Sequence, residues 1–401
     1  MLSNEYIDNL IEPFVERQEK LSSYVVNTIA ERVKQIGEVS KSDVYKLQQL
    51  YKNGADTKLI NSQIAKVANV QIKEVKAMIK KVAVDTYKQA KPYYDYRGKT
   101  QIPYEQNTKL QRSVKAISDQ TAETFKNLSN SKATGFTIRD AKNPTINKFY
   151  NTTDTYKTVI DEAVQSVTTG VLDFDTAMRR TLKQLNDSGM RRMYWDNGYS
   201  RRLDSTVRMN LLGGIRQIND KVQLQIADET KADGVELSAH SFSAPDHEPI
   251  QGRIFTLEQF ERLQNDLDFE DVEHTKFSAI RRPIGEWNCR HFITAIVIAV
   301  HEQTWTTKEL EELKKQNAKG YTDRTGRHYT MYECTQAQRS YETSIRYAKE
   351  GYMMAKNAGN DKLMGYYTSR IAELNKQYRQ FSKDCGLSVQ RKRTSVVGFS
   401  Y

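Results

Sequence analysis

Apolar residues recur every three to four positions through most of the first 230 residues, which is the pattern of amphipathic helices. The first apolar stripe consists of Leu2, Tyr6, Leu10 and Phe14. Pro13 lies inside this stripe and is expected to kink or divide its helix. Residues 129–151 are rich in Ser, Thr and Asn and are expected to form an exposed connection. The sequence therefore predicts a long helical amino-terminal region with hardly any strand.

Two segments of this region allow more than one interpretation. Residues 59–81 space their apolar side chains as a helix-turn-helix does, with a basic second half, but two plain packed helices give the same spacing. The segment has no Gly at the turn, which favours the plain helices. Gly213 and Gly214 interrupt a single helical pattern from 200 to 228. Each Gly costs about 1 kcal/mol relative to Ala, so close packing or a bend is the expected reason.

The period of the apolar residues changes after residue 230. The predicted strands are residues 235–240, 253–255 and 291–300. The last of these is β-branched and apolar throughout, and we expect it to be buried on both faces. Thr256 and Thr306 each precede a Gln or Glu by three positions, so both are expected to begin helices with a capping box. These features predict a small α+β module.

The end of the chain returns to helix. Residues 320–330 alternate around a turn and indicate a hairpin, and residues 332–358 and 361–383 predict an antiparallel helical pair. The predicted fold class is α+β and predominantly helical. The predicted domains are a helical region at 1–230, the α+β module at 231–331, and the helical pair with a basic tail at 332–401.

Charge is distributed unevenly over a chain whose net charge is +11. Residues 228–275 carry 3 Lys and Arg against 13 Asp and Glu, whereas residues 314–401 carry 17 against 7. Segregated charge suits either ordered docking within a complex or ordinary solvated helix surface. Three distant cysteines favour a reducing compartment over a disulfide framework. The longest apolar run, at 292–300, is about half a membrane span, so we expect no membrane partner.

Four of the six histidines and one cysteine lie between 235 and 299. Cys289 and His291 would share one face of a strand, and a Pro-containing loop could bring His240 and His247 together. Thiolate and imidazole suit zinc, but the usual local spacings of zinc ligands are absent. Cys289 with a His base could serve nucleophilic catalysis, but no further catalytic motif accompanies it. We therefore predict no catalytic residue, metal, cofactor or small-molecule substrate.

Three groups of residues carry a resemblance to a known family. The groups are Ser238-Ala-His240, then Asp246-His247 with Gln251-Gly252, then Trp287-Asn288-Cys289-Arg290-His291. In this order they resemble the tailed-phage minor capsid protein 2 family, a relative of the Mu F-type head morphogenesis proteins. The similarity continues through residues 329–346 and 378–382. The family pattern has a further Cys shortly before Asn288, where this chain has Gly285-Glu286. That difference favours a hydrogen-bonded structural role for the motif.

The resemblance implies a structural head protein in the virion, present in a few copies near the portal vertex. Its implied partners are the portal protein, the major capsid protein, or both, with double-stranded DNA as a non-specific further partner. Arg391, Lys392 and Arg393 form the basic tail and are the candidate DNA contacts. The alternative function is a virion-packaged Cys/His enzyme, a hydrolase or transferase, built on residues 240–291.

Overall fold

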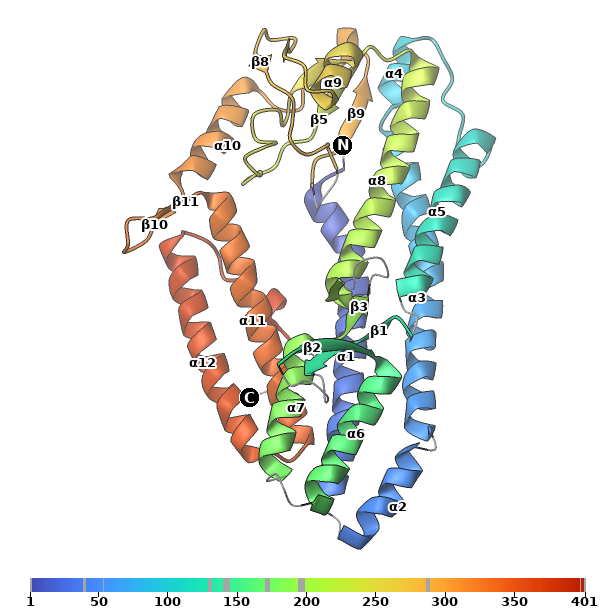
Figure 1. Cartoon of the computed structure of the whole chain (residues 1–401). Helices are drawn as coiled ribbons and strands as arrows, with labels where there is room; N and C mark the ends of the chain where they lie inside the picture. The colour runs from blue at the N-terminus through green and yellow to red at the C-terminus, as the bar shows by residue number, and fades with distance from the viewer. Residues whose placement is uncertain are drawn as a thin grey trace. The chain divides into compact units, whose positions relative to one another are not determined.

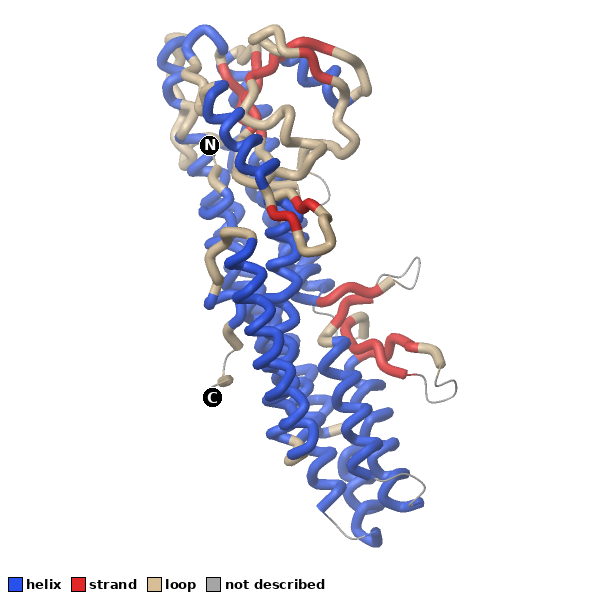
Figure 2. Tube along the Cα trace, turned by 90° about the vertical axis from the view of Figure 1, so that its left-hand side faces the viewer, coloured by secondary structure: helices blue, strands red, loops and turns tan. Residues whose placement is uncertain are grey.

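The computed structural model describes most of the chain. The described residues are 2–38, 41–52, 54–128, 132–139, 145–169, 174–193, 199–285, 289–396 and 398–399. As predicted, the chain is α+β and predominantly helical, with a few small antiparallel sheets (Figures 1 and 2). None of the helices in these ranges is both long enough and apolar enough to span a lipid bilayer.

The chain divides into two compact units, and each unit draws on three stretches of sequence. Unit 1 consists of residues 1–12, 72–124 and 209–336, and unit 2 of residues 13–71, 125–208 and 337–401. The divisions fall inside helices, so several helices contribute residues to both units. The shared helices are α1 (Asn4–Glu38), α3 (Ala55–Lys88), α5 (Thr108–Leu128), α8 (Leu203–Thr230) and α11 (Met331–Asn357). Compactness describes packing and not independent folding, so the three predicted domains stay a prediction.

Unit 1 combines helices with the predicted α+β module. Its other helices are α4 (Lys91–Tyr96), α9 (Leu257–Gln264) and α10 (Thr307–Lys319). Its strands are β5 (Gly234–Leu237), β6 (Ile254–Thr256), β7 (Phe269–Glu270), β8 (Lys276–Phe277), β9 (Ile293–Ile296), β10 (Tyr321–Thr322) and β11 (His328–Tyr329). β5 is the centre of an antiparallel sheet of order β6-β5-β9, while β7 pairs with β8 and β10 with β11. The two predicted capping boxes are confirmed at Thr256 and Thr306.

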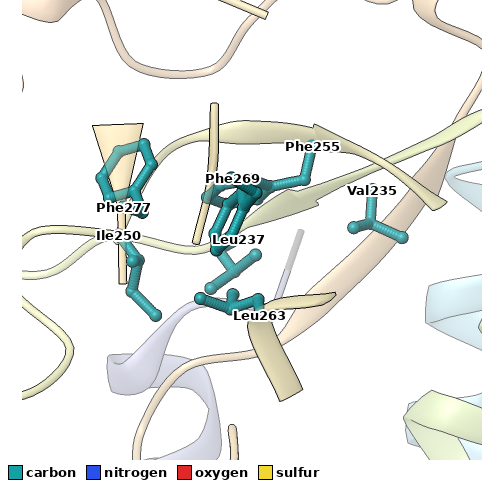
Figure 3. Close-up of a cluster of buried hydrophobic side chains, with 7 residues drawn as sticks. All are labelled: Val235, Leu237, Ile250, Phe255, Leu263, Phe269 and Phe277. Atoms are coloured by element: carbon teal, nitrogen blue, oxygen red, sulfur yellow. The ribbon is translucent and has the colours of Figure 1, made fainter. Parts of the chain in front are cut away.

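An apolar core fixes the module around β5. It consists of Val235, Leu237, Ile250, Phe255, Leu263, Phe269 and Phe277 (Figure 3). Phe255, Phe269 and Phe277 form a ring triad with centroids 5.7 Å apart in each pair, which adds aromatic contacts to the burial of apolar surface. The core thus joins the three-stranded sheet to α9 and to the β7-β8 hairpin.

Unit 2 is mostly helical but contains a sheet. Its own helices are α2 (Lys41–Lys52), α6 (Thr152–Thr169), α7 (Phe174–Ser188) and α12 (Asp361–Asp384). Its strands are β1 (Thr134–Arg139), β2 (Asn147–Asn151), β3 (Arg191–Met193) and β4 (Ser200–Arg202), in the order β2-β1-β3-β4. Phe136 and Ile138 of β1 are buried, since this strand packs against α6 and α7. The helical pair predicted near the end of the chain is confirmed by α11 and α12.

Several local predictions were wrong. The described part of residues 129–151 contains β1 and β2 and is not an exposed connection. α1 continues through Pro13, so Pro13 does not divide it, and α3 is one helix through residues 59–81, so neither two packed helices nor a helix-turn-helix lies there. The strand predicted at 291–300 is only β9, because β5 offers just four residues for pairing. Beyond it, the Asp233 carboxylate accepts the Ile298 N–H at 2.8 Å and the chain turns.

Gly214 has the close packing predicted for the Gly213-Gly214 pair. A Cβ added to Gly214 would lie 2.6 Å from Thr121 Oγ1, whereas one added to Gly213 would meet nothing within 4 Å. The α8 backbone therefore approaches α5 at a distance that only a glycine at 214 permits.

Candidate functional site

The strands of the module bring two separate stretches of chain to one place. Cys289 and His291 lie directly before β9, and the loop at 241–252 leaves the end of β5, which pairs with β9. Ser238 extends this pairing, because its N–H donates to the Phe292 carbonyl and its hydroxyl accepts the Phe292 N–H, both at 2.9 Å. A turn in which the His247 N–H donates to the Ala244 carbonyl directs His247 back toward the strand.

Three side chains meet at the centre of this arrangement. Cys289 Sγ lies 3.3 Å from His247 Nδ1 and 3.5 Å from His291 Nδ1. The His291 N–H also faces the same sulfur at 3.4 Å. All three residues are buried, with Cys289 only 3 % exposed. We call His247, Cys289 and His291 the Cys/His cluster.

The outer nitrogen of each histidine in the cluster faces an oxygen. His247 Nε2 lies 2.6 Å from the Arg282 carbonyl, and the Arg282 guanidinium is held by both oxygens of Asp246 at 2.8 and 3.0 Å. His291 Nε2 lies 3.4 Å from both Gln251 Oε1 and Ser243 Oγ. These oxygens leave the Nδ1 atoms of both rings directed at the sulfur.

The pKa values follow from burial and from the contact between the cluster members. Burial alone would lower the pKa of His247, but the hydrogen bond and charge of Cys289 outweigh it and raise that pKa. Burial alone would raise the pKa of Cys289, but His247 and backbone hydrogen bonds at His291 and Gly285 lower it. Burial, together with the charges of His240 and His247, lowers the pKa of His291 to about 2. Contact with His247 thus favours the thiolate form of Cys289, whereas burial favours the neutral form of the His291 ring.

Two of the predicted motif residues support the cluster from its edge. The His240 ring stacks against His291 with centroids 4.6 Å apart, and the His240 N–H donates to Gln251 Oε1 at 3.1 Å. Gly252 has φ +68, and a Cβ there would lie 2.4 Å from Leu310, so the tight turn after Gln251 requires a glycine. His240, His247, Gln251, Gly252, Cys289 and His291 are thus brought together.

Two other predicted motif residues have different outcomes. Arg290 points away from the cluster, and its guanidinium donates to both carboxylate oxygens of Asp8 at 2.5 and 2.7 Å. Asn288 lies outside the described residues. Gly285, which stands near the place of the missing family cysteine, has φ +88 and packs against the Arg216 guanidinium. A side chain at 285 would overlap that guanidinium.

The candidate DNA-contact residues belong to unit 2. Arg391, Lys392 and Arg393 are exposed in a short 3-10 helix, η2 (Arg391–Thr394). Arg393 is partly engaged within the chain, because its guanidinium lies 3.8 Å from Glu342. Arg391 and Lys392 are therefore more available for contact with DNA than Arg393.

Unit 1 contains a second polar centre, around His301, that no sequence motif predicted. Glu236 is fully buried in β5 and lies 2.9 Å from His301 Nε2, while Tyr93 Oη lies 2.7 Å from His301 Nδ1. Glu236 also accepts the N–H and the hydroxyl of Thr304 at 2.7 Å. The buried carboxylate is therefore fully hydrogen-bonded, and the centre joins α4 to the chain after β9.

The chemistry open to the Cys/His cluster follows from its donor set and its burial. A thiolate and two imidazole nitrogens are ligands that zinc prefers, and a Cys beside a His is also the pair used in nucleophilic catalysis. Catalysis on a large substrate would require access to a sulfur that is almost entirely buried. The geometry thus suits a structural or metal-binding centre better than an open active site.

Comparison with known proteins identifies the family of the chain. The family model described as phage minor capsid protein 2 matches residues 2–383. No curated protein and no solved structure matches the chain. Because the family match covers nearly the whole chain, the chain belongs to the phage minor capsid protein 2 family and is a structural protein of a phage virion.

Proposed function

We propose that this chain is a non-enzymatic minor head protein that binds the portal or the major capsid protein at the portal vertex. The observation that carries the proposal is that a single structural-protein family accounts for nearly the whole chain. Both units and the Cys/His cluster then belong to one virion protein, and neither unit is an appended enzyme domain.

The burial of the Cys/His cluster supports a structural function rather than an enzymatic one. His247, Cys289 and His291 are each at most 3 % exposed, and Arg282, Gln251 and Ser243 surround the two rings. In our proposal the cluster ties the loop at 241–252 to β9. The alternative, a virion-packaged Cys/His enzyme, predicts that Cys289→Ala abolishes a chemical step while particles still assemble.

Unit 1 offers a surface that suits docking to another virion protein. Leu257, Leu267 and Val272 are exposed by 46, 50 and 41 %. The exposed acidic residues Glu258, Glu261, Asp266, Asp268 and Glu270 are their neighbours in the sequence. We call this set the acidic patch. Exposed apolar residues among like charges suit a partner whose own surface is apolar and basic, because complementary charge steers the encounter.

Incorporation into particles tests this docking. A chain carrying Glu258→Lys, Glu261→Lys and Asp268→Lys should enter particles at least about tenfold less well, because a basic partner surface would now repel it. The matched control reverses three exposed acidic residues elsewhere in unit 1, Glu105, Glu311 and Glu312. Quantitative mass spectrometry of particles from a complemented deletion phage gives the readout. Equal incorporation of both variants would refute docking through the acidic patch.

Unit 2 carries a basic surface that favours contact with DNA as a second role. The exposed positions of α12 carry five basic residues, Lys362, Arg370, Lys376, Arg379 and Lys383, against three acidic ones, Asp361, Glu373 and Asp384, and η2 follows it. An excess of exposed basic side chains suits a polyanion, and binding through them would be weak and independent of sequence. Packaged double-stranded DNA is the polyanion that a head protein meets.

The salt dependence of DNA binding tests this second role. Each phosphate contact contributes about −0.9 to the slope of log affinity against log salt on duplex DNA. Replacing Arg391 and Lys392 with Ala should therefore flatten the slope by about 2 units, and adding Arg393→Ala should flatten it by less than one further unit because Arg393 faces Glu342. The control Lys58→Ala with Lys66→Ala removes the same charge from α3 and should leave the slope unchanged. A slope equal to wild type in the η2 variant would assign these charges to other contacts.

A further inference from the structure

We propose that His247, Cys289 and His291 bind a zinc ion, with Cys289 as a thiolate ligand and both histidines bound through Nδ1. This reverses the metal-free expectation drawn from sequence spacing. The ligands come from a loop and from the start of a strand, so no local spacing motif is needed to assemble them. The inference goes beyond the virion role and holds whichever capsid partner the chain binds.

The distances in the cluster fit the ion. The three candidate ligand atoms all lie within 4.8 Å of one another. Zinc–sulfur and zinc–nitrogen bonds of about 2.3 and 2.0–2.1 Å place tetrahedral sulfur and nitrogen ligands roughly 3.5 Å apart. Cys289 Sγ lies 3.3 and 3.5 Å from the two Nδ1 atoms, so both sulfur–nitrogen distances match those of a tetrahedral zinc site.

The tautomer of His247 directs a lone pair at the sulfur. Its Nε2 faces the Arg282 carbonyl at 2.6 Å, and a carbonyl can only accept, so Nε2 carries a proton. Neutral His247 therefore has its lone pair on Nδ1. A carbonyl that orients the outer nitrogen of a histidine is the arrangement usual around metal-bound histidines.

Gln251 favours the same tautomer for His291. The His240 N–H donates to Gln251 Oε1, which sets the orientation of that amide. The same oxygen faces His291 Nε2, which favours a proton on Nε2 and the lone pair on Nδ1; the Ser243 hydroxyl at the same distance can donate or accept. Gln251 is thus a positioning residue for the proposed ligand.

With both rings in this tautomer, the hydrogen bonds available to the sulfur leave one Nδ1 atom without a donor. A Cys289 thiol has one proton and can donate to one Nδ1 only. If the proton moves to His247, that ring donates to the thiolate, and the His291 lone pair still faces a negative sulfur at 3.5 Å. A buried acceptor without a donor is costly, whereas a zinc ion satisfies the sulfur and both nitrogens at once. The fourth coordination position is left to water.

Metal analysis of the full-length protein, purified without a chelator or metal-affinity step, gives the first test. Wild type should hold about one zinc per chain, and Cys289→Ser and His247→Ala should each lose at least about nine tenths of it. The matched controls are His274→Ala, an exposed histidine of the same module, and Cys385→Ala, a cysteine of unit 2. Both controls should keep the wild-type zinc content. Gln251→Ala should weaken zinc affinity about 10- to 100-fold in a competition titration.

Cobalt substitution keeps the proposal testable if the ligand variants fail to fold. Metal-free wild type, shown to be folded by circular dichroism, should develop thiolate-to-cobalt absorption in the near ultraviolet when Co²⁺ is added at one equivalent. Adding Zn²⁺ should displace this absorption. Folded wild type that holds no zinc and gives no cobalt absorption would overturn the proposal. So would His247→Ala or Cys289→Ser with an undiminished zinc content.

Discussion

The Cys/His cluster of unit 1 and the charged centres of unit 2 satisfy their buried polar groups in different ways. In unit 1, irregular segments beside a small sheet bring together cysteine, histidine and amide side chains, as in the Cys/His cluster. In unit 2, charged side chains on regular helices and strands meet one another. Arg202 stacks on the Tyr347 ring at 3.6 Å and lies 3.6 and 3.9 Å from Asp204 and Glu350.

In a second centre of unit 2, charged side chains also meet one another. Arg32 of α1 binds Asp56 of α3 at 2.9 and 3.2 Å, and the Tyr156 hydroxyl of α6 donates to the same carboxylate at 2.5 Å. The centre thus joins three helices through charge. The Cys/His cluster therefore depends on the geometry of neutral or weakly charged groups, whereas these two centres of unit 2 depend on the balance of buried full charges. Unit 1 also buries carboxylates, at Glu236 and Asp271, and each of them faces a basic side chain.

Removing Arg202 should produce the largest effect. Arg202→Ala removes the counter-charge that lies closest to Asp204 and Glu350, both largely buried, and leaves Glu350 only Arg346, so we expect a loss of up to about 3–5 kcal/mol in the free energy of unfolding. Hydrogen exchange followed by mass spectrometry should show the loss of protection in unit 2 peptides before unit 1 peptides. Arg180→Ala removes an exposed arginine of α7 and serves as the control. Equal loss of protection in both units would remove the distinction between them.

The glycine pair in α8 tests how closely the helices of unit 1 must pack. Gly214→Ala should lower the free energy of unfolding by about 1–2 kcal/mol, because the overlap with Thr121 outweighs the gain in helix propensity. Gly213→Ala should instead raise it by up to about 1 kcal/mol, because its Cβ meets nothing. Urea titrations of the two variants against wild type measure the difference. The same sign for both would show that α8 does not need close approach at 214.

The pH dependence of unit 2 should show the smallest effect. Burial raises the pKa of Glu350, although Arg202 and Arg346 pull it down, and Asp204 adds to the rise. The folded state then binds more protons than the unfolded state above a pH of about 4.5, so this residue makes stability fall as pH rises toward the folded pKa. Glu350→Gln should abolish that fall, which is at most about 1.4 kcal/mol per pH unit. Urea titrations at pH 5, 6 and 7 check it, and a variant whose stability falls with pH as steeply as wild type would contradict this assignment.

The sequence predicted features with local signals better than the sheet of unit 2, for physical reasons. The capping boxes and the strands β5 and β6 of unit 1, and the helical pair α11 and α12, depend on neighbouring residues, so their signals are local. The four-stranded sheet of unit 2 depends on long-range pairing. Its strands β3 (Arg191–Met193) and β4 pair through arginines, Arg191 with Arg202 and Arg192 with Arg201. In the sequence these arginines resemble solvated surface residues.

The candidate site was predictable in its members but not in its surroundings. His240, His247, Cys289 and His291 stood out as a cluster of rare residue types. The partners that fix the two rings, Arg282 and Ser243, have no motif and come from folding of the loops. The length of β9 was wrong for a related reason: β-branched residues favour a strand, but a strand ends where its partner ends.

The central claim, that this chain functions as a structural component of the head, is tested most directly by quantifying it in purified particles. Mass spectrometry of gradient-purified virions, calibrated with labelled peptides, should find a few copies per particle, and little free protein should remain in the cleared lysate. A chain lacking residues 1–130 or ending before 230 should be poorly incorporated. Virions that contain none of the chain, alongside abundant free protein in the lysate, would contradict the structural account and favour the enzyme.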